Sequence, residues 1–205
     1  MTNQVSNIKK SLGLSEPKEK FNYNKLLSIH LQSNDPDNFS RFIKSIEKNV
    51  ENIDLIEIVV KIDDTDINMN DALKRLVKES KVSIKYISTP LLGDFSDLWR
   101  SMNDMLLVCE KDTYFIWNMN DEMRIPVAGW DNILKNYVGI FPDDLFRLRT
   151  SRFKYRNYSD PWECCFAPET SAITTKKWIE TSGNWNPTLG PDTFNQLVAY
   201  YFSYH

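Results

Sequence analysis

Cysteine and histidine are scarce in this chain of 205 residues, which has three cysteines and two histidines. Cys164 and Cys165 are adjacent, and an odd cysteine count with this spacing fits neither a disulfide framework nor a CxxC metal motif. A reducing compartment is therefore expected, and we predict a cytoplasmic location. His30 and His205 are too far apart in the sequence to indicate a histidine-based zinc site.

Long apolar runs and an excess of positive charge are also missing. No run approaches the ~20 apolar residues of a membrane-spanning helix, and the N-terminus has no apolar segment of the secretory-signal type. Lys and Arg number 25 against 28 Asp and Glu, a net charge of −3. That balance argues against binding to a nucleic-acid backbone, which needs a concentrated basic face. We expect no transmembrane segment and no nucleic-acid partner.

Glycine-rich phosphate-binding motifs are absent too. The sequence contains no GxGxxG after the first predicted strand, no GxxxxGK[ST] and no GxSxG nucleophile elbow. Any phosphates bound by this chain would therefore be held mainly through a metal ion.

The overall composition, 41% hydrophobic and 26% charged, is typical of a globular protein, and the length suits one domain. Residues 1–23 form a polar extension, and residues 24–205 the predicted domain. Strands are expected at 25–32, 54–62, 82–87, 114–119 and near 145–150, alternating with amphipathic helices. The last helix, over 192–204, should turn five apolar residues inward: Phe194, Leu197, Val198, Tyr201 and Phe202. This order predicts an α/β, Rossmann-like domain with a mainly parallel central sheet and helices on both faces.

Polar clusters follow three of the predicted strands. In a parallel sheet the carboxyl ends of the strands share one edge, where ligands bind, so the clusters should form one site. Crowded carboxylates with little nearby Lys or Arg suit Mg²⁺ or Mn²⁺, which take one or two carboxylates plus substrate phosphates. The three clusters are Gln32-Ser33-Asn34-Asp35, Asp63-Asp64-Thr65-Asp66 and Asn120-Asp121-Glu122.

These clusters, with the MRIPVAGW that follows the third, resemble family-2-type glycosyltransferases of the GT-A fold. The resemblance spans roughly residues 26–202. It implies transfer of a sugar from a nucleoside-diphosphate sugar to the hydroxyl of an unknown glycan, lipid or protein acceptor, with inversion. By resemblance, the base and ribose would be bound by Gln32, Ser33, Asn34 and either Asp63 or Asp64.

The later motifs carry the other implied roles. The segment LLGDFSDLWRSMND resembles the stretch that faces the nucleotide sugar, which assigns Arg100 and Asn103 to that role. Asn120-Asp121-Glu122 stands where the family has Asp-x-Asp, so Asn120 and Asp121 would face the nucleotide sugar, and Asp121 and Glu122 would bind Mn²⁺ or Mg²⁺. In the segment PETSAITTKKWIETSGNWNPTLGPDTF, Asp192 matches the general base.

For several residues the sequence allows two roles. Asp192 follows Gly190-Pro191 and equally suits the N-cap of the last helix. Arg100 equally suits an exposed helix charge, and His30, inside a strand, favours core packing over catalysis. Asn and Glu replace the outer acids of the family motif. The alternative function is therefore a non-catalytic module that binds a nucleotide sugar or carbohydrate.

Overall fold

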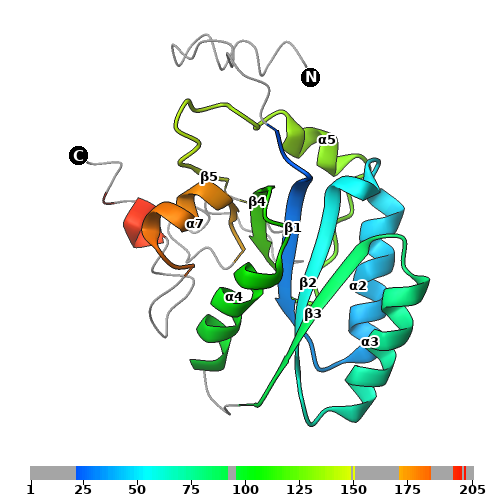
Figure 1. Ribbon diagram of the computed structural model, residues 1–205. Helices are drawn as coiled ribbons and strands as arrows, with labels where there is room; N and C mark the ends of the chain where they lie inside the picture. Colours follow the sequence, from blue (N-terminus) through cyan, green and yellow to red (C-terminus); the bar gives the residue numbers. More distant parts are fainter. Residues whose placement is uncertain are drawn as a thin grey trace, which may run out of the picture.

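The computed structural model describes residues 22–91, 96–148, 150, 171–185, 196–199 and 201. Its centre is a six-stranded sheet in the order β3-β2-β1-β4-β6-β5 (Figure 1). The strands are β1 Lys25–Gln32, β2 Ile56–Asp63, β3 Ser83–Thr89, β4 Thr113–Asn118, β5 Arg147–Leu148 and β6 Ile173–Thr175. The helices are α2 Pro36–Asn49, α3 Ile67–Glu79, α4 Ser96–Val108, α5 Trp130–Lys135 and α7 Lys176–Ser182, with a short 3-10 turn at Ile53–Leu55.

The first four strands are parallel, as the alternation of strands and helices predicts. β1 pairs with β2 on one side and with β4 on the other, and β2 pairs with β3. The chain therefore builds outward from β1 to β3 and then returns to the opposite side of β1. This reversal opens a crevice at the carboxyl ends of β1 and β4, the place where ligands bind in open α/β sheets.

Helices cover both faces of the sheet (Figure 1). On one face, the apolar stripes of α2, α3 and α5 pack on residues such as Leu27, Ile29 and Phe115. On the other face, α4 and α7 pack on Val59 and Ile116. The predicted α/β fold with a mainly parallel sheet is confirmed.

Side-chain caps fix where the helices begin. The Asp35 carboxylate accepts hydrogen bonds from the backbone N–H groups of Asp37 and Asn38 at the start of α2, and Pro36 occupies the first turn. The Asp66 carboxylate accepts from the N–H of Met69 in α3 in the same way. The polar residues after β1 and β2 thus serve as helix caps as well as edge residues.

The structure departs from the sequence expectations at several places. β2 begins two residues later than predicted because the preceding residues form the 3-10 turn. The antiparallel strand β6 was not predicted at all, since its three residues are too few to show a period. Leu197 and Tyr201, predicted to face inward, are 60% and 66% exposed.

No helix within the described residues is long and apolar enough to cross a membrane. Phe194, Phe202 and Asp192 lie outside the described residues, as does the whole segment 151–170.

Candidate functional site

A hollow of about 250 Å³ lies at the carboxyl ends of β1, β2 and β4. It is at the crevice where the strand order reverses, and residues from all three predicted clusters contribute to it. The structure therefore brings the ends of β1, β2 and β4 to one site, as a parallel sheet requires. The lining residues are Gln32, Ser33, Asn34, Lys61, Asp63, Leu91 and Asp121.

Ser33 links the first and third clusters. Its backbone N–H donates to the Lys61 carbonyl at 3.1 Å, which extends the pairing of β1 with β2 beyond the strand end. Its hydroxyl donates to Asp121 Oδ2 at 2.5 Å. The Asp121 carboxylate is thereby held at the β1–β4 crevice with one oxygen engaged.

The turn that carries Asp121 is fixed by its own hydrogen bonds. The Met123 N–H donates to the Asn120 carbonyl at 3.0 Å. The Arg124 guanidinium donates to the backbone carbonyls of Asp121 and Met123. Because Arg124 binds main-chain oxygens, the negative charge of the Asp121 side chain stays available on the side of the hollow.

Lys61 brings a positive charge to the hollow, and this residue was not predicted. Its side chain is 2% exposed, and Nζ lies 2.5 Å from Asp63 Oδ1. Lys61 and Asp63 are two positions apart on β2, so both project from the same face of the strand. The strand period places Lys61 and Asp63 on one face of β2, but the apolar segment around Lys61 does not indicate that its ammonium reaches the hollow.

Other predicted site residues lie elsewhere. Asp64, Asn120 and Glu122 are exposed, and none of them is among the described residues that line the hollow. Arg100 is also exposed, with its guanidinium 5.3 Å from the centre of the Trp99 ring.

Asn103 connects two elements. Its Nδ2 donates to the Trp99 carbonyl at 3.1 Å, and its Oδ1 accepts from the Trp185 N–H at 2.9 Å. This amide therefore ties α4 to the segment after α7. Asp192, the predicted general base, lies outside the described residues.

A divalent metal ion fits this edge of the sheet only if a bound substrate supplies part of its coordination shell. Among the described residues, no three His, Cys, Asp or Glu side chains come together in a group that could hold a metal. Asp121 presents a carboxylate whose Oδ2 accepts from Ser33. Mg²⁺ and Mn²⁺ commonly use one or two carboxylates and complete their shell with substrate phosphates and water, and Asp121 suits that kind of site.

A layer of buried polar side chains lies beneath the hollow. His30 on β1 is opposite Asn118 on β4, and they are 1% and 7% exposed. His30 Nε2 lies 3.0 Å from Ser28 Oγ, and burial lowers the pKa of His30 to about 3, so the ring is neutral. Within the described part of the chain, His30 Nδ1 and Asn118 Oδ1 have no hydrogen-bond partner. His30 is packed in the core, as the sequence favoured.

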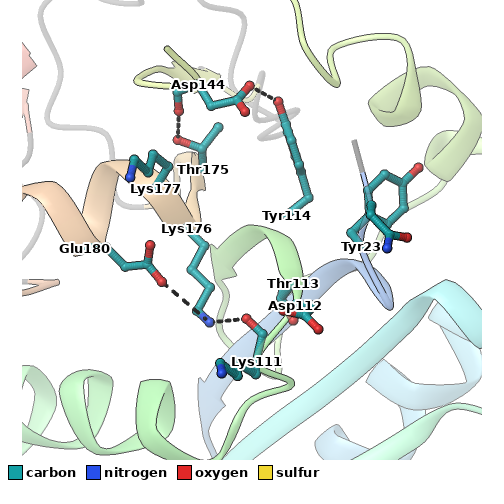
Figure 2. A pocket seen from close by; sticks show the side chains of 11 residues that line it. Tyr23, Lys111, Asp112, Thr113, Tyr114, Asp144, Thr175, Lys176, Lys177 and Glu180 are labelled. Atoms are coloured by element: carbon teal, nitrogen blue, oxygen red, sulfur yellow. Dashed lines mark hydrogen bonds and ion pairs between the residues drawn. The ribbon is translucent and has the colours of Figure 1, made fainter. Parts of the chain in front are cut away.

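A second hollow, of about 310 Å³, lies at the amino ends of the parallel strands (Figure 2). Several of its polar groups are paired with one another. Lys176 Nζ donates to the Lys111 carbonyl and lies 3.7 Å from Glu180 Oε1. The Tyr114 hydroxyl donates to Asp144, and burial raises the pKa of both the phenol and the carboxyl. We therefore place the candidate site at the carboxyl edge.

Comparison with known proteins identifies the class of fold. No family model matches the sequence, and a search of curated proteins finds no match either. Among solved structures, the chain is similar to the mannosyltransferase PcManGT from Pyrobaculum calidifontis, solved in complex with GDP-Man and Mn²⁺. The TM-score is 0.62 and the identity 11%, over 93% of this chain and 56% of that one. This chain thus spans little more than half the length of that structure.

Two further solved structures match more weakly. S. aureus TarS has a TM-score of 0.43 at 14% identity, covering 53% of this chain and 19% of that one. The mannosyltransferase Ktr4p from S. cerevisiae has a TM-score of 0.32 at 13% identity, covering 73% and 50%. From the first similarity, the chain has the α/β fold of a glycosyltransferase domain.

Proposed function

We propose that this chain is a glycosyltransferase that moves a sugar from a nucleoside-diphosphate sugar to an acceptor hydroxyl, with inversion at the anomeric carbon. The observation that carries the proposal is the hollow at the strand-order reversal, where Ser33, Asp63 and Asp121 come together from three strand ends. The glycosyltransferase fold supports the same reaction class. The acceptor is a glycan, lipid or protein.

The nucleoside occupies the β1–β2 side of the hollow in this proposal. Gln32, Asn34 and Asp63 supply amide and carboxylate groups there, which suit the hydroxyl and N–H groups of a ribose and a base. Asp63 is preferred to Asp64, which is exposed and outside the lining. Arg100 is proposed to approach the sugar, together with Asn103 and Asn120.

The diphosphate occupies the β4 side, with Asp121 and Glu122 as the residues that would hold Mn²⁺ or Mg²⁺. A bound divalent ion supplies positive charge to the phosphate oxygens of the leaving group. The contribution of the chain itself is to orient Asp121, through the hydroxyl of Ser33 and the turn held by Arg124.

Asp192 is proposed as the general base. Its carboxylate takes the proton of the acceptor hydroxyl as that oxygen forms a bond to the anomeric carbon. The bond from the same carbon to the diphosphate oxygen breaks on the opposite face, and its electron pair leaves with the diphosphate. Because attack and departure are on opposite faces, the configuration inverts.

A panel of nucleotide sugars tests this proposal, first by binding and then by turnover. With Mn²⁺ present, the matching nucleoside diphosphate should raise the melting temperature by an amount that grows as RT ln(1 + [L]/Kd). The matching nucleotide sugar should be hydrolysed slowly, and transferred when the acceptor is supplied. Asp192→Asn should keep the binding and lose about 10²- to 10⁴-fold in transfer. Wild-type protein that binds no member of the panel would exclude the proposed function.

The second candidate function is a binding module without turnover. The observation that favours it is the exposure of Asn120 and Glu122, which leaves Asp121 as the one residue of its cluster in the hollow. Such a module would be stabilised by a nucleotide sugar and would leave it intact in the presence of Mn²⁺.

A further inference from the structure

Lys61 is a charged side chain in an unusual place. It lies on β2, between β1 and β3, and is 2% exposed. Lysine is almost never buried to this extent unless it is paired. The ammonium reaches the carboxyl edge of the sheet, where it lines the hollow together with Gln32, its partner in the β1–β2 register.

The contact with Lys61 gives the two oxygens of the Asp63 carboxylate different surroundings. Oδ1 lies 2.5 Å from Lys61 Nζ. Within the described part of the chain, Oδ2 accepts no hydrogen bond, and the Asp63 side chain is 19% exposed on the hollow. Asp63 Oδ1 is therefore fixed by a short charged hydrogen bond, and Oδ2 is available to a ligand that enters the hollow.

The position of Lys61 does not suit a diphosphate held at Asp121. β1 separates β2 from β4 in the sheet. Two strand spacings amount to about 10 Å, and Lys61 Nζ is turned to its own strand neighbour Asp63. The charge of Lys61 thus acts on the nucleoside side of the hollow.

We propose that Lys61 is a positioning residue that fixes Asp63, so that Asp63 Oδ2 accepts a hydrogen bond from a donor group of the nucleoside. This inference rests on the proposed function. It adds the residue that orients Asp63, the hydrogen-bond acceptor for the nucleoside. The donor is either a ribose hydroxyl or a ring N–H of the base, because a carboxylate only accepts.

A thermodynamic cycle tests the coupling. Nucleotide affinity is measured by calorimetry for wild type, Lys61→Met, Asp63→Asn and the double variant, which removes both members of the pair. Each change should weaken binding by about 10- to 100-fold, the worth of one hydrogen bond to a charged group. Because Lys61 acts through Asp63, the double variant should lose no more than the Asp63→Asn variant. Losses that multiply in the double variant would overturn the inference.

Two comparisons separate positioning from other roles. The Lys61→Met variant should lose the same factor for a nucleoside monophosphate as for the diphosphate, whereas a larger loss for the diphosphate would make Lys61 a phosphate ligand. Its melting temperature should change by less than about 5 °C, since Asp63 faces the hollow and can be hydrated. Lys176→Met, a partly buried lysine paired with Glu180 at the opposite edge, is the matched control and should keep full affinity.

A comparison of nucleotides with different bases identifies the nucleoside group that donates the hydrogen bond to Asp63. Diphosphates of uridine and guanosine carry a ring N–H at the edge that pairs, and those of cytidine and adenosine do not. If the ring N–H is the donor, only the first two should bind more weakly to Lys61→Met. If a ribose hydroxyl is the donor, all the nucleotides that bind wild type should lose the same factor. Wild type that binds none of them contradicts the proposed function, whereas affinity unchanged in Lys61→Met contradicts this inference alone.

Discussion

The hydrogen bond between Ser33 and Asp121 joins side chains that are 88 positions apart in the sequence. They meet because β1 and β4 are paired, with His30 opposite Asn118 near the carboxyl end of each strand. The backbone pairing continues past Asn118, where the Met119 N–H donates to the His30 carbonyl at 2.9 Å. The position of Asp121 is thus an extension of the sheet and does not depend on a flexible loop.

Changing Asp121 or Ser33 should affect binding to different extents. Asp121→Asn removes the charge that a divalent ion prefers, so we expect diphosphate affinity in Mn²⁺ to fall at least about 10-fold, with partial recovery at higher Mn²⁺. Ser33→Ala removes only the orienting hydroxyl, and we expect a loss of about 2- to 10-fold. Calorimetric titration measures both, and Asp71→Asn, an exposed acid on α3, should bind as wild type does. Equal losses for Ser33→Ala and Asp71→Asn would remove the orienting role of Ser33.

The site was only partly predictable from single residues. The clusters after the strands could be predicted because strand ends in a parallel sheet share an edge, and Ser33, Asp63 and Asp121 do line one hollow. Lys61 could not be recognised from an apolar segment, because the direction of a long side chain depends on what packs around it. The exposure of Glu122 depends on the turn that follows β4, which the sequence pattern does not determine.

At the scale of elements, the short helix α5 is held to the rest of the domain by a buried carboxylate. Asp131 is 1% exposed and accepts hydrogen bonds from the backbone N–H groups of Glu51 and Asn52 at 3.0 and 2.9 Å. Burial opposes its ionisation, but these hydrogen bonds outweigh burial and keep the pKa of Asp131 below its usual value. α5 starts after Gly129, whose φ of 66° is the left-handed conformation that glycine favours.

Removing the Asp131 carboxylate should therefore destabilise the whole domain. Asp131→Ala removes the charged acceptor of two part-buried backbone hydrogen bonds, and we expect the free energy of unfolding to fall by about 3 kcal/mol. Asp131→Asn keeps one acceptor oxygen and should lose less. Urea unfolding measures both changes, with Asp104→Asn, an exposed acid on α4, as the control. A loss below about 1 kcal/mol in Asp131→Ala would mean that water replaces the carboxylate.

Elements were predictable in proportion to their length and regularity. β1 matches its predicted range, and β2 and β4 nearly do, because strands buried on both faces read as continuous apolar segments. Helix α5 covers only Trp130–Lys135 of the eleven predicted residues 127–137, since the chain enters it through Gly129. β5 and β6 have two and three residues, and their antiparallel pairing depends on contacts that no local pattern records.

At the scale of the whole molecule, the two faces of the sheet differ in chemistry. The face under α2 and α3 is apolar, whereas the face under α4 and α7 includes buried polar side chains. These residues share that face because they alternate with the apolar ones along β1, β2 and β4. Burial of groups that can ionise links the stability of the domain to pH. The buried polar residues that these strands place on the face under α4 and α7 are Ser28, His30, Glu57, Lys61 and Asn118.

His30 determines the direction in which pH changes the stability of the domain. Burial lowers its pKa from 6.5 to about 3, so between these values the unfolded chain binds a proton that the folded domain does not. Stability from neutral His30 is therefore complete above pH 6.5 and is lost as the pH falls towards 3. We expect a loss of about 2 kcal/mol between pH 6.5 and pH 5, measured by urea unfolding at each pH. His30→Gln cannot titrate, so its stability should change less over the same interval, and an equal slope in both proteins would assign the pH dependence to other groups.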